Sequence, residues 1–327
     1  MSESPEIQNI MVTGATGFVG RSVVRELLAR DLGPVCLVRS RRKLAGQHPD
    51  AGPDRLIIVE GSLDDRTALR QAAELSQAAI HLVGIIMARR LKGQTFGRVH
   101  AQGTRNAVDA AGEAGIRRFV HMSALGTRPD GVSTYHRTKW AAEEYLTHSG
   151  LDWTILRPSL IHGSEGEFMR LMKRFICGLL PPVIPYFGSG QAKVQPVSVK
   201  DVAFCAVEAL RRGDTIGKVY PLGGPKAYSW IELYNTCRAT MPGAKRWKPL
   251  ASLPVSGARL MAALTAAPMA LAELVMPSIG RFRFDAGQVQ MTQEDSVCDH
   301  TVAERAFDIR MRSFEDELEL YAGKTDC

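Results

Sequence analysis

Ser123, Tyr135 and Lys139 have the side-chain types and the spacing that proton transfer to or from a substrate oxygen requires. Tyr135 and Lys139 stand four positions apart in a segment with helical spacing, so both would project from one helical face. A phenol with its ordinary pKa of ~10 is a poor acid–base catalyst at neutral pH. A lysine ammonium beside it would lower that pKa by favouring the phenolate. Ser123 could hydrogen-bond a substrate oxygen as charge develops there.

The surrounding pattern predicts the strand and the helix that would position these residues. Residues 118–122 form a strand-like run that places Ser123 at its carboxyl end, and a helix follows from Tyr135 to about residue 148. An ordinary amphipathic helix could carry the same tyrosine and lysine by chance. A serine at a strand end, after four strand–helix units, is a more specific signal. We therefore expect Ser123, Tyr135 and Lys139 to act as a catalytic group.

A glycine-rich turn near the N-terminus predicts a phosphate-binding loop. Residues 9–13 form a mainly apolar run, three glycines follow, and helical spacing begins after them. Gly14 would allow the turn, Gly17 would let a pyrophosphate approach the backbone, and Gly20 would let helix and strand pack closely. Backbone N–H groups and the positive end of the helix dipole would hold the phosphates. The predicted pyrophosphate contacts are Gly14, Thr16, Gly17, Phe18, Val19 and Gly20.

The residue after the second predicted strand indicates which dinucleotide the site prefers. Residues 35–38 form that strand, and Arg39 stands where an NAD-binding site carries Asp or Glu. A guanidinium there would pair with a 2′-phosphate, and no carboxylate is present to repel it. We therefore expect NADP(H) as the cofactor. The alternative is a solvated basic loop, to which residues 41–43 could belong.

Two more strand-like runs predict further cofactor contacts. Residues 56–59 lead into a loop that falls where an adenine ring would lie. Residues 79–84 form a strand whose carboxyl end should face the cofactor. The contacts predicted from these two strands are Ser62, Leu63, Val83 and Gly84.

Two polar residues nearby have more than one interpretation. His81 lies inside the strand at residues 79–84, where a packed core histidine is expected rather than a catalytic one. Asn106 lies on a predicted helix over residues 99–114 that stops at Gly115. Its amide could order Lys139 through a water molecule, or it could be an ordinary amide on the helix surface.

Residues 13–20, residues 123–126 and the Tyr-x-x-x-Lys pair resemble the short-chain dehydrogenase/reductase superfamily, with the glycine spacing of its extended and atypical branches. Residues 156–163 resemble the segment that in this superfamily passes the nicotinamide, which adds Pro158 to the implied cofactor contacts. The resemblance implies an α/β fold. In it, a doubly wound parallel Rossmann sheet carries a smaller, mainly helical C-terminal substrate lobe.

The resemblance also implies a domain organisation and two functions. Residues 1–158 would form the NAD(P)-binding Rossmann domain and residues 159–327 the substrate lobe, with residues 194–224 returning to the sheet. Residues 286–291 and 294–297 resemble bacterial relatives of the NADPH-binding accessory subunit of respiratory complex I, and a related protein of ubiquinone biosynthesis. One implied function is an NADP(H)-dependent oxidoreductase acting on a carbonyl or alcohol. The other is a non-catalytic NADPH-binding scaffold or assembly protein of a membrane complex.

The sequence departs from the superfamily's pattern at two positions. His100 replaces the usual Asn before a Gly-Thr pair, and Ser62 stands where an acidic residue often lies beside the adenine. We expect both departures to affect cofactor contacts more than the class of reaction.

Composition restricts the location and the partners of the chain. The start lacks a cationic and apolar signal sequence, no uninterrupted apolar run reaches transmembrane length, and the six cysteines and eight histidines have no metal-ligand spacing. We therefore expect a cytoplasmic protein without a metal site. A formal charge of +7 favours anionic partners in general, and we do not expect nucleic acid to be one of them.

The C-terminal half contains two apolar helical patterns. Residues 168–179 have one apolar face with basic residues opposite, and a proline-rich stretch ends the helix. We expect this helix to cap a pocket for an apolar, quinone- or lipid-like substrate. The alternative is a helix on a membrane surface, for which residues 253–276 offer a second candidate. Peripheral contact with the inner membrane or a membrane complex stays open, as do the substrate, the reaction direction and the oligomeric state.

Overall fold

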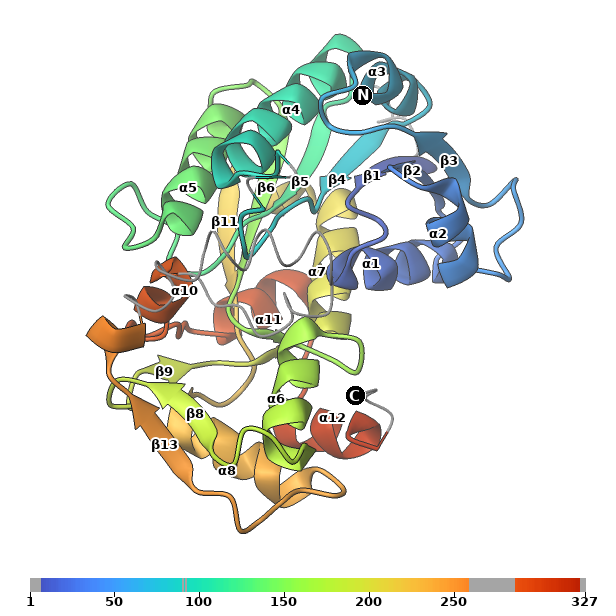
Figure 1. Ribbon diagram of the computed structural model, residues 1–327. Coiled ribbons are helices and arrows are strands. Elements are labelled where there is room, and N and C mark those ends of the chain that lie inside the picture. The colour runs from blue at the N-terminus through green and yellow to red at the C-terminus, as the bar shows by residue number, and fades with distance from the viewer. Residues whose placement is uncertain (1–6, 90, 92, 259–285, 324–327) are drawn as a thin grey trace.

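A seven-stranded parallel sheet forms the centre of the larger part of the molecule (Figure 1). The structure is a computed structural model that describes residues 7–89, 91, 93–258 and 286–323. The strands of the sheet are β1 (Asn9–Thr13), β2 (Gly33–Val38), β3 (Ile57–Glu60), β4 (Ala78–His81), β5 (Arg118–Met122), β6 (Asp152–Pro158) and β11 (Lys218–Leu222). Their spatial order is β11-β6-β5-β4-β1-β2-β3, and every neighbouring pair runs parallel. The order reverses between β1 and β4, where sheets of this kind bind ligands.

Helices cover both faces of this sheet. One face packs against α1 (Phe18–Ala29), α2 (Arg41–Gln47), α7 (Val199–Arg211) and α11 (Thr301–Phe307). The other face packs against α3 (Arg66–Glu74), α4 (Gly103–Glu113) and α5 (Thr134–Thr147). Two short segments, the π-helical η2 (Gly97–Gln102) and the 3₁₀-helical η3 (Gly213–Thr215), adjoin α4 and α7. The expected doubly wound α/β fold is confirmed.

The central strand β1 explains why the sheet strands are apolar on both sides. Ile10 and Val12 belong to the core on the α1 and α7 side, and Met11 between them belongs to the core on the α3 and α4 side. All three side chains are fully buried. Strands covered on both faces have no solvent-facing position for polar residues, so they read as continuous apolar runs.

A smaller lobe lies beyond the carboxyl ends of the sheet strands (Figure 1). Its elements are β7 (Ile161–His162), α6 (Glu167–Cys177), β8 (Ile184–Phe187), β9 (Lys193–Val194), β10 (Val197–Ser198), β12 (Tyr228–Ser229), α8 (Trp230–Thr240), β13 (Leu250–Leu253), α10 (Ala286–Met291) and α12 (Phe314–Tyr321). The strands of this lobe pair only in short two-stranded sheets among the described residues. Helices therefore carry most of its core, as expected.

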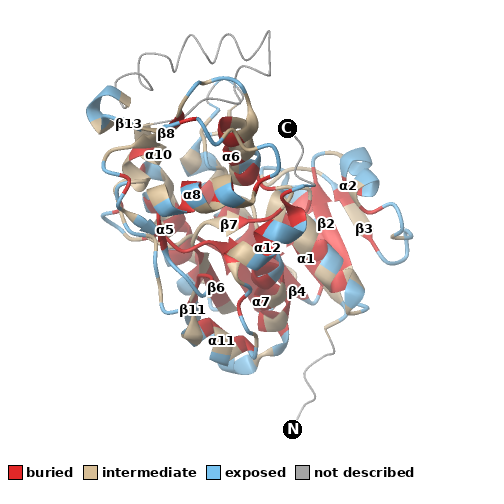
Figure 2. Cartoon of the chain, turned by 90° about the horizontal axis from the view of Figure 1, so that it is seen from below, coloured by how far each residue is buried: buried red, intermediate tan, exposed pale blue. Residues whose placement is uncertain are grey.

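The apolar face of α6 is part of the lobe's own core. Met169, Met172, Phe175 and Ile176 are buried against α8, β8 and α12 (Figure 2). This burial excludes a helix that lays its apolar face on a membrane. The second candidate, residues 253–276, falls mostly on residues 259–285, outside the described residues. Within the described part of the chain, no helix has the length and apolar composition needed to cross a bilayer.

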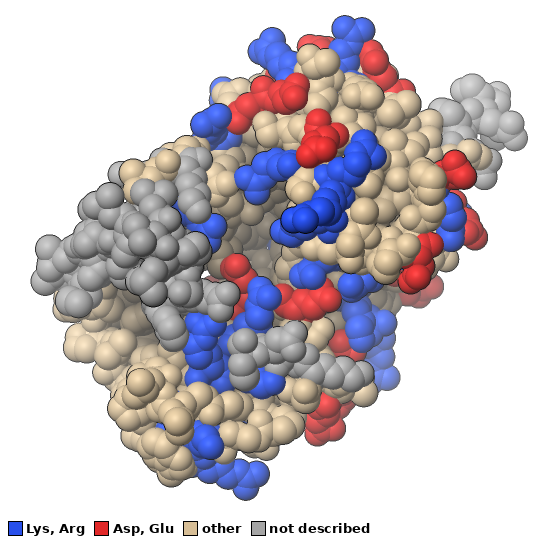
Figure 3. All heavy atoms as spheres, turned by 45° about the vertical axis from the view of Figure 1, so that its right-hand side comes forward, with Lys and Arg blue, Asp and Glu red and all other residues tan. Residues whose placement is uncertain are grey.

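A hollow separates the sheet region from the C-terminal lobe on the face seen in Figure 3, and Lys and Arg side chains gather on both sides of it. The carboxyl ends of the sheet strands point toward this lobe in Figure 1. The hollow therefore lies where the loops after the strands meet the lobe, and Asp and Glu side chains stand among the Lys and Arg side chains there.

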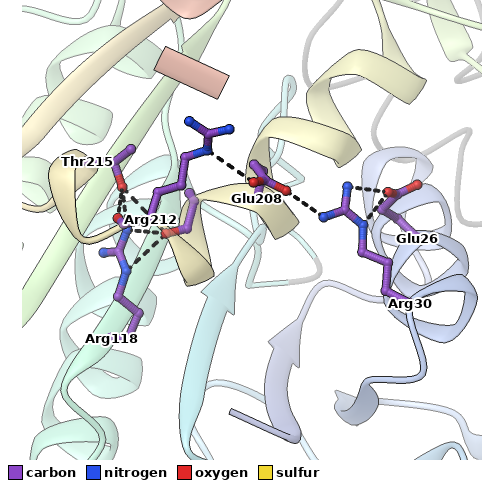
Figure 4. A network of polar contacts seen from close by, with 7 residues as sticks. Glu26, Arg30, Arg118, Glu208, Arg212 and Thr215 are labelled. Atoms are coloured by element: carbon purple, nitrogen blue, oxygen red, sulfur yellow. Dashed lines mark hydrogen bonds and ion pairs between the residues drawn. The ribbon is translucent and has the colours of Figure 1, made fainter. Parts of the chain in front are cut away.

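Two segments of the C-terminal half return to the sheet. Helix α7 lies beside α1, and Glu208 of α7 bonds Arg30, which directly follows α1, at 2.7 Å and Arg212 at 3.1 Å (Figure 4). Helix α11 buries Ala303 and Phe307 in the same core. Helix α7 and strand β11 lie within residues 194–224, whose place in the domain organisation stays a prediction, and the sequence analysis did not anticipate the return through α11.

Candidate nucleotide-binding and catalytic site

The turn between β1 and α1 has the backbone geometry of a phosphate-binding loop. Gly14 has φ of +80°, and the Gly17 N–H donates to its carbonyl oxygen at 2.9 Å. A Cβ atom on Gly20 would lie 2.1 Å from that same oxygen, so only glycine permits this approach of α1 to β1. Gly17 is the N-cap of α1 and no side chain caps the helix. The first-turn amides of Phe18 and Val19 are therefore available to phosphate oxygens.

The side chain of Phe18 closes one side of this loop. A Cβ on Gly163 or on Gly166 would lie 3.1 Å from its ring. Arg21 and Glu165 form an ion pair of 2.7 Å beside it. The start of α6 is thereby fixed against the start of α1, and the C-terminal lobe borders the phosphate loop.

Arg39 lies at the carboxyl end of β2 with its side chain exposed. It has no hydrogen-bond or ion-pair partner among the residues that the structure describes. The next residues form α2 rather than a loop, with Ser40 accepting a hydrogen bond from the Lys43 N–H at its start. Arg41 donates to the Ile58 carbonyl at 2.7 Å and is thus engaged with the neighbouring strand. Arg39, at the strand end itself, is thus free to meet a ligand, as are the exposed side chains of Arg42 and Lys43 in the first turn of α2.

The loop with Ser62 and Leu63 is held by Asn106. The Asn106 side chain donates to the Leu63 carbonyl at 2.7 Å and accepts from Gln102 at 2.8 Å. Ser62 accepts a hydrogen bond from the Asp64 N–H at 3.3 Å. Asn106 therefore anchors the predicted adenine loop to α4, and neither of its two predicted roles describes this contact.

Lys139 joins the ends of two strands to α5. Its ammonium donates to the carbonyl of Met122, the residue before Ser123, at 2.8 Å. A Cβ on Gly84 would lie 3.2 Å from the same nitrogen, so the segment after β4 also reaches it. The side chain is buried, and burial lowers the pKa of Lys139 to about 8 although Glu143 acts to raise it. The end of β5, the segment after β4 and helix α5 thus meet at the Lys139 side chain.

The pKa of Tyr135 differs from the expectation. Burial raises the pKa of Tyr135 to about 12, whereas a neighbouring ammonium was expected to lower it. Two contacts explain the difference. The rings of His100 and Phe96 pack around the phenol, with centroids 5.2 and 6.1 Å from its ring. The Lys139 ammonium bonds the Met122 carbonyl and not the phenol oxygen. Ser123 is buried and donates to Thr127 Oγ1 at 3.3 Å.

His100 is a site residue whose role the sequence analysis missed. Its Nε2 accepts from the Ile85 N–H at 3.0 Å, which assigns the proton of the neutral ring to Nδ1. The Nδ1–H then donates to Thr138 Oγ1 at 3.0 Å. Burial and the Lys139 charge lower the pKa of His100 to about 2, so the ring stays neutral. The replacement of the usual Asn at this position was the signal that could have identified it.

His81 is a core histidine, as expected. It is fully buried, and its two ring nitrogens bond Thr13 Oγ1 at 2.7 Å and Thr104 Oγ1 at 3.1 Å. Burial and the Lys139 charge lower its pKa to about 3. Pro158 is also buried, and its carbonyl accepts from the Leu125 N–H at 2.9 Å, which ties the loop after Ser123 to the end of β6.

Comparison with known families matches residues 14–212 to a family described as NAD(P)H-binding. This span includes the phosphate loop, Ser123, Tyr135 and Lys139. The chain belongs to the NAD(P)H-binding family. Its wider superfamily is that of the extended short-chain dehydrogenases/reductases, which confirms the predicted resemblance.

Several characterised proteins are similar to this family member in sequence. Mitochondrial NADH dehydrogenase (ubiquinone) 1 alpha subcomplex subunit 9 of Arabidopsis thaliana is 31% identical over 261 residues, which are 77% of this chain and 62% of that protein. A ceramide reductase of Caulobacter vibrioides is 34% identical over 207 residues, 62% of each protein. The photosystem II assembly factor Ycf39 of Synechocystis is 27% identical over 78% of this chain and 74% of that protein. The chain thus spans about three fifths of the length of the first two.

Solved structures show the same fold. A dTDP-glucose 4,6-dehydratase of Streptomyces venezuelae with NAD bound superposes with a TM-score of 0.72 at 20% identity, over 96% of each chain. These comparisons confirm the fold and a nicotinamide cofactor. The choice of NADP(H) and the roles of single residues stay predictions. Among the described residues, no group of three or more His, Cys, Asp or Glu side chains is arranged to hold a metal ion.

Proposed function

We propose that this family member is an NADP(H)-dependent oxidoreductase that acts on a carbonyl or alcohol in an apolar, quinone- or lipid-like molecule. The observation that carries the proposal is the bond of Lys139 to the Met122 carbonyl. It brings the tyrosine–lysine helix to the strand end that bears Ser123, beside Gly84 and on the same sheet edge as the uncapped start of α1. A structural nucleotide site needs the glycine loop but not this second group.

The chain's own residues would have the following roles in binding the cofactor. Phe18 and Val19 amides bind the pyrophosphate, and Arg39 pairs with the 2′-phosphate. Ser62 and Leu63 border the adenine, while Val83, Gly84 and Pro158 border the nicotinamide. The bound cofactor supplies or accepts the hydride.

Proton transfer at the substrate oxygen falls to Tyr135, with Ser123 donating a hydrogen bond to that oxygen. Lys139 would leave the Met122 carbonyl to hold the nicotinamide ribose and lower the pKa of Tyr135. His100 holds the segment at Ile85 against α5, one residue before Lys139. It positions both sides of the site without exchanging a proton.

The alternative function is a scaffold that binds NADPH without turnover, as part of or in the assembly of a membrane complex. Two observations favour it. Similar proteins include a subunit of NADH dehydrogenase and a photosystem II assembly factor. Burial raises the pKa of Tyr135 to about 12, so the phenol loses its proton less readily than a free tyrosine does. For either function we propose a cytoplasmic protein that associates peripherally with the inner membrane.

Tyr135→Phe is the substitution that separates the two functions. NADPH oxidation is measured with a panel of quinones and apolar ketones, and NADPH affinity is measured by calorimetry. Loss of the proton donor should lower turnover by about 10²- to 10⁴-fold and leave the affinity nearly unchanged. Tyr145→Phe is the matched control, because Tyr145 lies on the same helix and bonds Asp109 at 2.5 Å away from the site. Equal turnover of wild type and Tyr135→Phe rules out the mechanism. Retained NADPH that no acceptor oxidises supports the scaffold.

A further inference from the structure

Three exposed apolar side chains stand at one end of the C-terminal lobe. Leu179, Leu180 and Trp247, which we call the lobe tip, have exposed fractions of 73%, 76% and 63%. The leucines follow the end of α6, and the tryptophan lies in the connection from α8 to β13. This end of the lobe is remote from the sheet in Figure 1. Exposed large apolar side chains grouped in this way mark an interaction surface.

Backbone and lysine hydrogen bonds hold the two loops of the lobe tip together. The Lys245 N–H donates to the Ile176 carbonyl at 3.0 Å. The Lys248 ammonium, whose side chain is fully buried, donates to the carbonyls of Phe175 at 2.6 Å and Gly178 at 3.2 Å. A lysine at the C-terminal carbonyls of α6 also complements the helix dipole. The exposed leucines and the tryptophan are therefore presented together by an ordered support.

The two loops of the lobe tip carry basic residues and no acidic ones. Residues 168–200 and 233–258, which contain the two loops, have no Asp or Glu. The basic residues of α6 and of the α8–β13 connection are Arg170, Lys173, Arg174, Lys245, Arg246 and Lys248. The lowest part of the molecule in Figure 3 carries Lys and Arg among uncharged side chains. Apolar side chains flanked by cations in the same loops complement an anionic surface.

We propose that the lobe tip docks on an anionic phospholipid bilayer, with Leu179, Leu180 and Trp247 at the level of the headgroups and the acyl boundary. Tryptophan is favoured at this depth because its ring is apolar and its N–H still reaches water. Each cation close to the surface adds about fivefold to partitioning into an anionic membrane. This inference deepens the peripheral location proposed above, and its test measures binding without turnover, so either proposal can fail alone.

Flotation of the full chain with vesicles tests the docking. Vesicles of phosphatidylcholine mixed with phosphatidylglycerol should bind the wild type, and vesicles of phosphatidylcholine alone should bind it at least tenfold less. Leu179→Ala combined with Leu180→Ala should lower binding to the mixed vesicles by about tenfold or more. Leu320→Ala is the matched control, since Leu320 is 66% exposed on α12, and it should bind as the wild type does. Circular dichroism and NADPH affinity verify that each variant is folded.

Charge and depth are tested separately. Lys245→Gln combined with Arg246→Gln should lower binding to the mixed vesicles by roughly twentyfold. Brominated lipid in the vesicles should quench the tryptophan fluorescence of the wild type, and this quenching should be lost in Trp247→Phe. Equal binding to both vesicle types, no binding to either, or losses as large in Leu320→Ala as in the leucine variant would overturn the proposal. Binding only to native membranes, lost after protease treatment of those membranes, would assign the lobe tip to a membrane protein instead.

Discussion

Arg39 is the residue on which the choice between the two nicotinamide cofactors depends. Its guanidinium is exposed at the end of β2 and has no partner in the described part of the chain. Arg39→Asp should weaken NADPH binding by about 10- to 100-fold, because a charge-assisted bond becomes a repulsion. NADH binding should change less than about threefold. Calorimetric titration of both cofactors measures this, with Arg70→Asp on α3 as the control. Equal losses for both cofactors would mean that the 2′-phosphate lies elsewhere.

Lys139 should give the protein a stability that rises with pH. Its pKa is about 8 in the folded protein and ~10.5 in the unfolded chain, so between these values the unfolded state binds more protons. The contribution of Lys139 to the free energy of unfolding should therefore increase by about 1 kcal/mol per pH unit above pH 8. Urea unfolding of wild type and Lys139→Met at several pH values isolates it. The free energy of unfolding of the wild type minus that of Lys139→Met should rise with pH, and a value that stays constant or falls would contradict the burial of the ammonium.

The sequence predicts which residues meet in the site better than it predicts their state. The i,i+4 spacing puts Tyr135 and Lys139 on one helix, the strand pattern puts Ser123 after β5, and Lys139 reaches the carbonyl of Met122 beside Ser123. The pKa of Tyr135 depends on how Phe96 and His100 pack around the phenol, and these come from a different helix. Contacts between separate elements of this kind have no signature in a single sequence.

At the scale of elements, the close approach of α1 to β1 depends on Gly20. A Cβ there would meet backbone atoms of Gly14 and Ala15 at 2.1 and 2.7 Å, and no flexible side chain can move aside. Gly20→Ala should lower the free energy of unfolding by about 1–3 kcal/mol and weaken NADPH binding more than tenfold. Gly112→Ala is the control, because Gly112 lies in α4 with open space around its Cβ position. It should stabilise the protein by roughly 0.5–1 kcal/mol.

Urea unfolding and NADPH titration measure both glycine variants. If Gly20→Ala binds NADPH as the wild type does, the phosphates do not lie on the start of α1. Similar unfolding free energies for Gly20→Ala and Gly112→Ala would mean that α1 shifts easily on the sheet.

Element boundaries were predicted well where a strand is apolar throughout and less well near the site. β1 and β5 match the expected residues because both faces of each are buried. β4 ends at His81, earlier than expected, since the following residues leave the sheet to reach Lys139. The π-helical η2 replaces the first turn of the expected helix and places His100 toward α5. A local insertion of this kind depends on tertiary contacts, which helical periodicity does not encode.

At the scale of the whole molecule, Arg118 of β5 holds helix α7 and the following η3 against the sheet. Its buried guanidinium donates to the carbonyls of Asp152 and Ala209, both at 2.5 Å. It also donates to Thr215 Oγ1 at 2.8 Å (Figure 4). It thereby joins β5, β6, α7 and η3. Burial lowers its pKa to about 10, which leaves it charged at neutral pH.

Arg118→Met should destabilise the protein by about 3–5 kcal/mol, because buried carbonyls lose their donors. The neighbouring Arg117 is the matched control, with a side chain 72% exposed and 3.6 Å from Asp152 Oδ1. Arg117→Met should cost less than about 1 kcal/mol. Urea unfolding compares the two, and equal losses would contradict the role of Arg118 in holding α7.

Helix α7 lies within residues 194–224, which the resemblance implies return to the sheet, whereas the return of α11 was not predictable. Phe307 is apolar like many lobe residues, and nothing in its neighbourhood in the sequence shows which core it joins. The assignment of residues 1–158 and 159–327 to separate domains stays a prediction. Helices α7 and α11 belong to the second range by sequence, but they pack on the sheet of the first.

A crystal structure of the protein with NADPH bound tests the central claim most directly. The account predicts the pyrophosphate at the amides of Phe18 and Val19, the 2′-phosphate at Arg39, and the nicotinamide within about 3–4 Å of the Tyr135 hydroxyl. Lys139 should have exchanged the Met122 carbonyl for the ribose. A nicotinamide ring that lies away from Tyr135, with Lys139 still bonded to Met122, would contradict the catalytic account and leave a protein that only holds the cofactor.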